Sequence, residues 1–114
     1  MKHKMRLHNT PFELIKNQTK TIEMRLLDEK RSLIKQNDII EFENRKNNEK
    51  IETKVIALHQ YPNFDELYKH HNKISLGYEE NEIASPSDME QYYPKEEQTR
   101  YGVVGIEIEL ITNE

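Results

Sequence analysis

Residues 18–31 read QTKTIEMRLLDEKR, and this stretch decides how the rest of the chain is interpreted. Within it, residues 21–26 alternate polar and apolar side chains, which is the period-two pattern of a half-buried β-strand. The apolar set, which should face a core, consists of Ile22, Met24 and Leu26. The opposite face then carries the Thr21 hydroxyl, the Glu23 carboxylate and the Arg25 guanidinium, with neighbours about 7 Å apart.

Lys20 has the wrong parity to join that polar face, so it reaches Glu23 only if the chain bends just before the strand. Four more charged residues follow directly, at positions 28–31. Two interpretations are open. The polar face is either a solvated surface with a weak ion pair, or a groove for an anionic or nucleobase-like group, since arginine binds phosphate and carboxylates accept hydrogen bonds from base amino groups.

The segment KTIEMR at residues 20–25 resembles the signature of ASCH domains, which runs roughly Gly-x-Lys-x-x-Glu-x-Arg. Three further segments also fit, so the resemblance covers nearly the whole chain: LLDEKR at 26–31, NDIIEF at 37–42 and YGVVGI at 101–106. Two positions depart from the family pattern. Gln18 stands where the motif has glycine, and Asn37 replaces the glycine of a Gly-Asp pair, although asparagine also tolerates positive φ.

The resemblance implies an α+β fold, a small, partly open PUA-like β-barrel of about five to six strands with short peripheral helices. It is closest to the small bacterial single-domain type, and the length predicts one ASCH domain over residues 1–114.

Besides the strand over 21–26, the residue patterns predict further strands over 4–8, 38–45, 50–61 and 103–111. They also predict helices over 10–17 and 64–71, with short helices after 85 and 94. Residues 72–84 are expected to form a loop or a mobile flap. The apolar run at 55–58 predicts a helix over the outer side of its strand, and Gly105 predicts a close approach to the backbone.

The composition excludes several classes of site. The chain has no cysteine, which excludes disulfides, thiolate zinc sites and cysteine nucleophiles. Its five histidines lack metal-binding spacing, and three glycines are too few for a dinucleotide-binding turn, so we expect neither a metal nor a cofactor. No apolar run approaches the about 18 residues of a membrane span. No signal-peptide stretch follows Met1, so a cytoplasmic protein without membrane contact is expected.

The net charge of −4 is unevenly distributed along the chain. Residues 1–35 carry nine Lys or Arg against four acidic residues, whereas residues 36–114 carry eight against seventeen. A uniformly basic nucleic-acid binder is therefore not expected. A local basic patch would form, unless the two halves interleave and dilute it, from Lys2, Lys4, Arg6, Lys20, Arg25, Lys30, Arg31 and Lys35.

Six tyrosines outnumber three phenylalanines. Tyrosine rings near loops and helix ends can stack on bases, and this position favours Tyr78, Tyr93 and Tyr101 as groove residues. Tyr68 and Tyr92 are expected to serve in packing instead.

The resemblance implies binding of RNA or a modified nucleoside as the first hypothesis. Lys20 and Arg25 would engage phosphate or a carbonyl, and Glu23 would read a base edge or hold Arg25. Lys30 and Arg31 would widen the positive rim, and Tyr93 and Tyr101 would stack.

Two alternatives stay open, and the sequence does not decide whether the protein is an enzyme. Some family members hydrolyse acetylated cytidine and others are linked to RNA cleavage. In the amidohydrolases a catalytic lysine is followed three residues later by threonine, with a distant glutamate. Lys20 matches the lysine, but Glu23 stands at the threonine position, and Thr21 is another hydroxyl at this centre. The distant glutamate would fall near Glu79 or Glu80. The other alternative is a protein-interaction module that uses the acidic second half.

Overall fold

The computed structural model describes residues 1–112 of the chain. The strands are β1 (Lys2–Leu7), β2 (Ile22–Leu26), β3 (Ile39–Asn44), β4 (Lys50–Tyr61) and β5 (Val103–Leu110). The helices are α1 (Asn9–Lys16), α2 (Glu29–Ser32), α3 (Phe64–His70), α4 (Lys73–Leu76), the 3-10 helix η1 (Pro86–Gln91) and α5 (Lys95–Tyr101). Within these residues, no helix has both the length and the apolar character needed to cross a bilayer.

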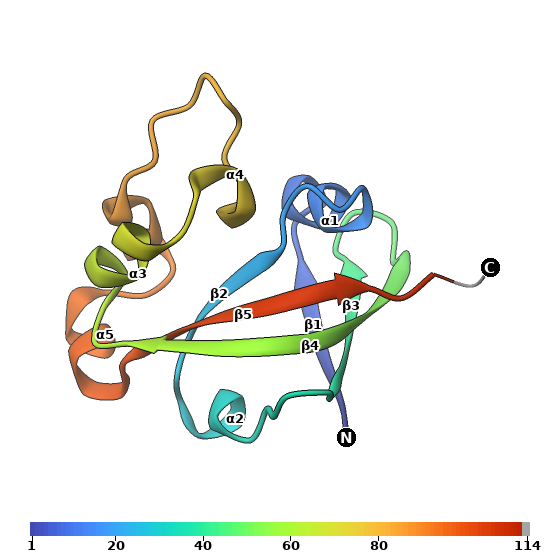
Figure 1. Cartoon of the computed structure of the whole chain (residues 1–114), viewed down its shortest axis with the longest axis horizontal. Coiled ribbons are helices and arrows are strands. Elements are labelled where there is room, and N and C mark those ends of the chain that lie inside the picture. Colours follow the sequence, from blue (N-terminus) through green and yellow to red (C-terminus); the bar gives the residue numbers. More distant parts are fainter. Residues whose placement is uncertain (113–114) are drawn as a thin grey trace.

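The five strands form one sheet in the order β1-β3-β4-β5-β2 (Figure 1). The pairing of β1 with β3 is parallel, and the other three pairings are antiparallel. The sheet curls into a half-barrel, so the edge strands β1 and β2 approach each other on the open side. There Arg25 Nη2 of β2 donates a hydrogen bond to the Arg6 carbonyl of β1 at 3.4 Å. The expected α+β fold, a partly open PUA-like barrel with short peripheral helices, is confirmed, and it has five strands.

A β-bulge in the middle of β4 explains its apolar run. The pairing with β5 shifts between Val55 and Ala57, which leaves Ile56 as the extra residue. Side chains therefore change faces at this point, and both faces of the strand carry apolar residues. As the sequence predicts, a helix covers the outer face: α3 packs on β4 and β5.

Two apolar clusters lie on opposite sides of the sheet. The first fills the half-barrel beneath α1 and includes Phe12, Ile15, Ile40, Phe42, Val55, Val104 and Ile106. The second lies between the sheet and the later helices and includes Ile22, Met24, Leu26, Phe64, Leu67, Leu76 and Val103.

The apolar face of β2 packs in the second cluster, as expected for a side facing a core. Glu23 and Arg25 pair with Ile106 and Val104, and paired residues share one face of a sheet, so both charged side chains lie on the half-barrel side. The expectation of a half-buried strand is wrong, because Glu23 is only 5% exposed. Tertiary packing buries both faces.

The segment expected to be a loop or flap contains a short helix. Asn72 caps α4 by accepting a hydrogen bond from the Ile74 N–H at 2.7 Å. Gly77 ends the helix in a left-handed conformation with φ 109°. This helix packs on β2, which places it against the signature strand.

Gly105 is a close-contact position, as predicted. A Cβ atom added there would lie 3.1 Å from Ile22 Cγ2 and 3.4 Å from Leu67 Cδ1. Gly105→Val is therefore expected to lower the free energy of unfolding by about 2 kcal/mol, because overpacking a filled site typically costs 1–3 kcal/mol. Urea denaturation followed by circular dichroism measures the change. A variant as stable as the wild type would show that β5 and α3 can separate without cost.

Candidate functional site

The chain bends immediately before β2, as the parity of Lys20 requires. Gln18 adopts a left-handed conformation with φ 68°, and the N–H groups of Thr19 and Lys20 both donate to the Leu14 carbonyl. The Thr21 N–H then donates to the Ser75 carbonyl at 3.0 Å, which ties the bend to α4. Gln18 and Asn37, the two positions where the family pattern has glycine, both have positive φ here.

Gln18→Gly is expected to raise the free energy of unfolding by about 0.5 kcal/mol. A left-handed conformation costs a residue with a Cβ atom about 1–2 kcal/mol, and glycine relieves this strain. The greater conformational freedom of glycine in the unfolded chain offsets about half of the stability gained. Thermal denaturation measures the difference, and Lys16→Gly, in the last turn of α1, is the control that should destabilise. A loss of stability in Gln18→Gly would mean that the bend is unstrained.

The bend carries the Lys20 side chain inward, where it is 6% exposed. Its Nζ donates to the Ile22 and Leu76 carbonyls at 2.8 Å each and lies 3.5 Å from Glu23 Oε1. Three acceptors thus surround the amine, which matches the three N–H donors of an ammonium group. Lys20 therefore joins β2 to α4 across a separation of 56 residues.

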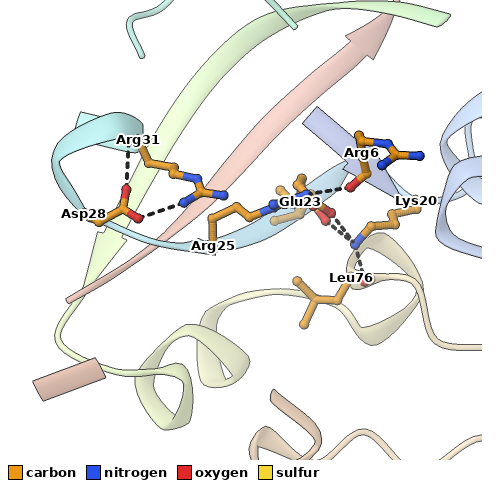
Figure 2. Close-up of polar contacts among 8 residues, drawn as sticks. Arg6, Lys20, Glu23, Arg25, Asp28, Arg31 and Leu76 are labelled. Atoms are coloured by element: carbon orange, nitrogen blue, oxygen red, sulfur yellow. Dashed lines mark hydrogen bonds and ion pairs between the residues drawn. The ribbon is translucent and has the colours of Figure 1, made fainter. Parts of the chain in front are cut away.

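Glu23 lies between two cations (Figure 2). Its Oε2 accepts a hydrogen bond from Arg25 Nε at 2.7 Å, while Oε1 faces Lys20. The Arg25 side chain is 14% exposed and that of Glu23 is 7% exposed, so this ion pair is largely removed from water. The three charged heads converge, with Glu23 in the middle.

The surroundings fix the charge of this triad. Burial alone would raise the pKa of Glu23, but Arg25 and Lys20 outweigh burial and lower that pKa below its ordinary value. Burial lowers the pKa of Lys20, and Glu23 offsets part of this effect. Burial also opposes the charge of Arg25, but Glu23 and Tyr93 beside it raise its pKa. Glu23 is therefore held as a carboxylate between the two basic side chains.

The triad lies at a cavity of about 720 Å³, which is within the usual range of 300–1,000 Å³ for small-molecule sites. Lys20, Glu23 and Arg25 all line it, together with Leu76 and Gly77 of the α4 region. The cavity is therefore bounded on one side by the signature strand and on the other by the segment that follows α3.

Four tyrosines line the same cavity, namely Tyr68, Tyr78, Tyr92 and Tyr93. The Tyr78 hydroxyl interacts with the Tyr68 hydroxyl at 2.8 Å and donates to Asp88 Oδ2 at 2.7 Å. Burial, and then these two partners, raise the pKa of Tyr78 well above its ordinary value, so it stays a neutral donor. Tyr92 is 56% exposed, which leaves its ring accessible at the rim.

The structure brings some of the predicted ligand-binding residues together and separates others. Lys20, Glu23, Arg25 and Tyr93 line the cavity. Tyr101 does not; its ring packs against the second apolar cluster, with Arg100 stacked 5.1 Å from its centroid. Thr21 does not line it either, and its peptide groups pair with Ser75 and Ile108.

Lys30 and Arg31 lie at an adjacent groove of about 460 Å³ rather than at the cavity. Lys4, Arg6 and Arg25 also line this groove, so much of the expected basic patch exists there. The alternative, an interleaving of the two halves of the chain that dilutes the patch, also occurs in part. Because β3 pairs with β1, Lys2 forms ion pairs with Glu41 at 3.3 Å and with Glu52 at 2.9 Å.

Sequence reasoning missed several cavity residues. Tyr68 and Tyr92 were expected only to pack, yet both line the cavity. Arg6 and Arg45 also line it, since the curl of the sheet brings the ends of β1 and β3 to the open side. No local pattern marks these four residues, but Gly77, one of three glycines in the chain, is a signal for close packing near α4.

Within residues 1–112, no group of three or more His, Asp or Glu side chains is arranged to hold a metal ion. The side chains at the site are a fixed carboxylate, two basic groups and a tyrosine wall.

Known proteins resemble this chain over nearly its whole length. The ASCH domain family model matches residues 5–112. The crystal structure of hypothetical protein PH0355 is similar, with a TM-score of 0.82 and 37% identity, over 97% of this chain and 100% of that one. The solution structure of protein PF0455 from Pyrococcus furiosus has a TM-score of 0.71 and 35% identity, over 99% of this chain and 100% of that one. No curated protein matches. The family model spans nearly the whole chain, and this protein therefore belongs to the ASCH domain family.

Proposed function

We propose that this protein binds RNA or a modified nucleoside in the tyrosine-lined cavity. The observation that carries the proposal is the fixed Glu23 carboxylate at a cavity of about 720 Å³. A carboxylate has about four lone-pair sites, so it can hold Arg25 and Lys20 and still accept a hydrogen bond from the amino group of a base. Because both ion pairs fix its position, little ordering remains to be done when a ligand binds.

Arg25 is suited to the anionic part of such a ligand. Its Nε is engaged by Glu23 and one Nη2 donor by the Arg6 carbonyl, which leaves further donors of the planar guanidinium for a ligand oxygen. Lys20, in contrast, has its three donors directed at protein acceptors. Its role in this proposal is therefore to position Glu23 and α4 rather than to contact the ligand.

The tyrosines supply the apolar contact that a base requires. A base stacked on an aromatic ring gains about 1–3 kcal/mol, and every base offers a face for stacking. Tyr92 and Tyr93 line the cavity beside the triad, and the exposed ring of Tyr92 lies at the rim. A base between this wall and Glu23 would have both stacking and hydrogen bonding.

Hydrolysis is the second candidate, favoured by a buried lysine beside a carboxylate at the cavity. Binding is better supported for three reasons. The Lys20 amine is engaged by three acceptors, the lowered pKa of Glu23 makes it a weak base, and Thr21 lies outside the cavity. We expect incubation with N4-acetylcytidine to release no acetate above the buffer control. Release that disappears in Lys20→Arg would instead identify a hydrolase.

The binding test uses a fluorescently labelled single-stranded RNA of ten nucleotides, followed by anisotropy at low salt, with unlabelled nucleosides as competitors. Tyr92→Leu is expected to weaken binding about fivefold or more through the loss of stacking. Tyr101→Leu is the matched control and is expected to leave binding unchanged, because Tyr101 does not line the cavity. The absence of binding by both RNA and nucleosides at low salt would overturn the proposal.

A further inference from the structure

The groove beside the cavity shares three residues with it, namely Arg6, Arg25 and Arg45. The cavity and the groove are therefore neighbouring parts of one concave surface on the open side of the half-barrel. Arg25 connects them most directly, because its Nε holds Glu23 while its side chain also lines the groove. A ligand seated at Glu23 therefore has an adjoining channel into which a second part could extend.

The charge of the groove is opposite in sign to that of the whole protein. Seven Lys or Arg side chains line it against two carboxylates, in a chain whose net charge is −4. Glu43 lies near Arg6 Nε at 3.4 Å and Lys50 Nζ at 3.9 Å, and Glu41 pairs with Lys2 outside the groove. Like charges gathered in a concave site raise the local concentration of anions.

Several of these cations have no acidic partner. Within residues 1–112, no carboxylate lies within 4.0 Å of the charged groups of Lys4, Lys30 or Arg45, and all three are exposed. These positions are therefore able to contact an anion without breaking an ion pair of the fold.

Arg31 also lines this groove, with its charge paired to Asp28. Its Nη1 donates to Asp28 at 2.7 Å, which fixes the guanidinium on α2, and Figure 2 shows it extending from α2 toward the β2 side of the site. Its Nε–H is buried and has no hydrogen-bond acceptor among the described residues.

We propose that the groove holds the phosphodiester backbone of a single-stranded RNA whose base occupies the cavity, an inference that rests on the proposed function. A free nucleoside would leave the cations of the groove without a partner, whereas a phosphate next to the base would meet Arg25 and Arg6 first. Further phosphates along the strand would meet Arg45, Lys30 and Lys4, which have no acidic partner to give up. The substrate class is therefore an oligonucleotide and not a free nucleoside.

The test compares RNA and nucleoside binding in Lys4→Gln/Lys30→Gln, two residues that line the groove but not the cavity. Binding is measured by anisotropy for RNA and by titration calorimetry for free nucleosides, over a series of KCl concentrations. RNA affinity at low salt is expected to fall about tenfold, and the slope of log K against log salt to decrease by roughly 1.4, since each phosphate contact on a single strand contributes about 0.7. Nucleoside affinity is expected to stay within about twofold of wild type. Lys54→Gln/Arg100→Gln removes the same charges from exposed positions that line neither cavity nor groove, and should leave the slope unchanged.

The other outcomes overturn specific steps. If Tyr92→Leu weakens RNA binding while Lys4→Gln/Lys30→Gln leaves affinity and slope unchanged, the groove does not hold the backbone, and the proposed function stands. If neither RNA nor nucleoside binds the wild-type protein, both proposals fail. If polyglutamate of equal charge displaces the RNA as effectively as unlabelled RNA does, the groove is a general polyanion surface and the assignment to a phosphodiester backbone is wrong.

Discussion

Glu23→Gln is expected to lower the free energy of unfolding by about 3 kcal/mol, the largest effect of a single substitution in the triad. Removing one partner of a buried ion pair typically costs 3–5 kcal/mol, because the remaining charge stays buried without compensation. Here two charges lose their partner, since Arg25 Nε lies 2.7 Å and Lys20 Nζ 3.5 Å from the Glu23 carboxylate. Glutamine can still accept one hydrogen bond, which places the expected loss at the lower end of the range. Urea denaturation at pH 7 measures it.

The pH dependence provides a second signature of the same interaction. Because Arg25 and Lys20 lower the pKa of Glu23 in the folded state, the unfolded chain takes up this proton at a higher pH. The stabilisation is complete above the unfolded pKa of about 4.3 and is lost as the pH falls through the folded pKa. The stability difference between wild type and Glu23→Gln should therefore be constant from pH 7 to about pH 5 and shrink below it.

The difference between the two proteins is the informative quantity in this experiment. The pKa of Asp38 is lowered to about 2, chiefly by its hydrogen bond with His3, so Asp38 also titrates at acidic pH. Its contribution is the same in both proteins and cancels in the difference. Lys20→Met/Glu23→Gln completes a double-mutant cycle and should cost less than the sum of the single changes, because the two side chains interact. Additive losses, or a stability difference that does not change below pH 4, would contradict a charged pair.

Gly77→Ala is expected to lower the free energy of unfolding by about 2–3 kcal/mol, for two separate reasons. Gly77 has φ 109°, where a residue with a Cβ atom is strained by about 1–2 kcal/mol. An added Cβ atom would also lie 3.1 Å from Lys20 Cδ, so it would push against the side chain that ties α4 to β2. Thermal denaturation measures the stability, and hydrogen exchange of the α4 amides locates the damage.

A double substitution separates these two reasons. In a Lys20→Ala background the close contact is absent, so Gly77→Ala should cost only the backbone strain, and its effect should fall by about 1 kcal/mol. An effect of the same size in both backgrounds would show that Lys20 does not restrain α4. Ser75→Ala, which removes a hydroxyl bound to the Asn72 carbonyl in the same helix, is the matched control with an intact φ.

Much of the fold could be predicted from local patterns. The alternation over residues 21–26 located β2, and the predicted strand over 50–61 matches β4 from Lys50 to Tyr61. The predicted helix over 64–71 matches α3, and Asn63 caps it by accepting a hydrogen bond from the Glu66 N–H at 2.9 Å. These features depend only on the side-chain period and the capping residues within a few positions of the chain. A short stretch of sequence is therefore enough to predict them.

Other parts of the site could not be predicted in this way. Residues 72–84 lack periodicity, and a helix of only four residues forms there because Asn72 caps it and Lys20 binds its last carbonyl. Tyr101 has the same composition cue as Tyr93, yet α5 directs it into the apolar packing instead of the cavity. Both residues are tyrosines near helix ends, so only the packing of the helices distinguishes them.

The sequence by itself determined the family, through motifs spread along the chain. It also determined the strand that carries Glu23 and Arg25 and the need for a bend before it, because both follow from residue order within one segment. The tertiary structure decided which distant groups meet that strand: the Leu76 carbonyl on Lys20, and Arg6 and Arg45 beside Arg25. The physical reason is that a bend fixes a direction locally, whereas the acceptor or charge found there depends on how the sheet curls and which helix covers it.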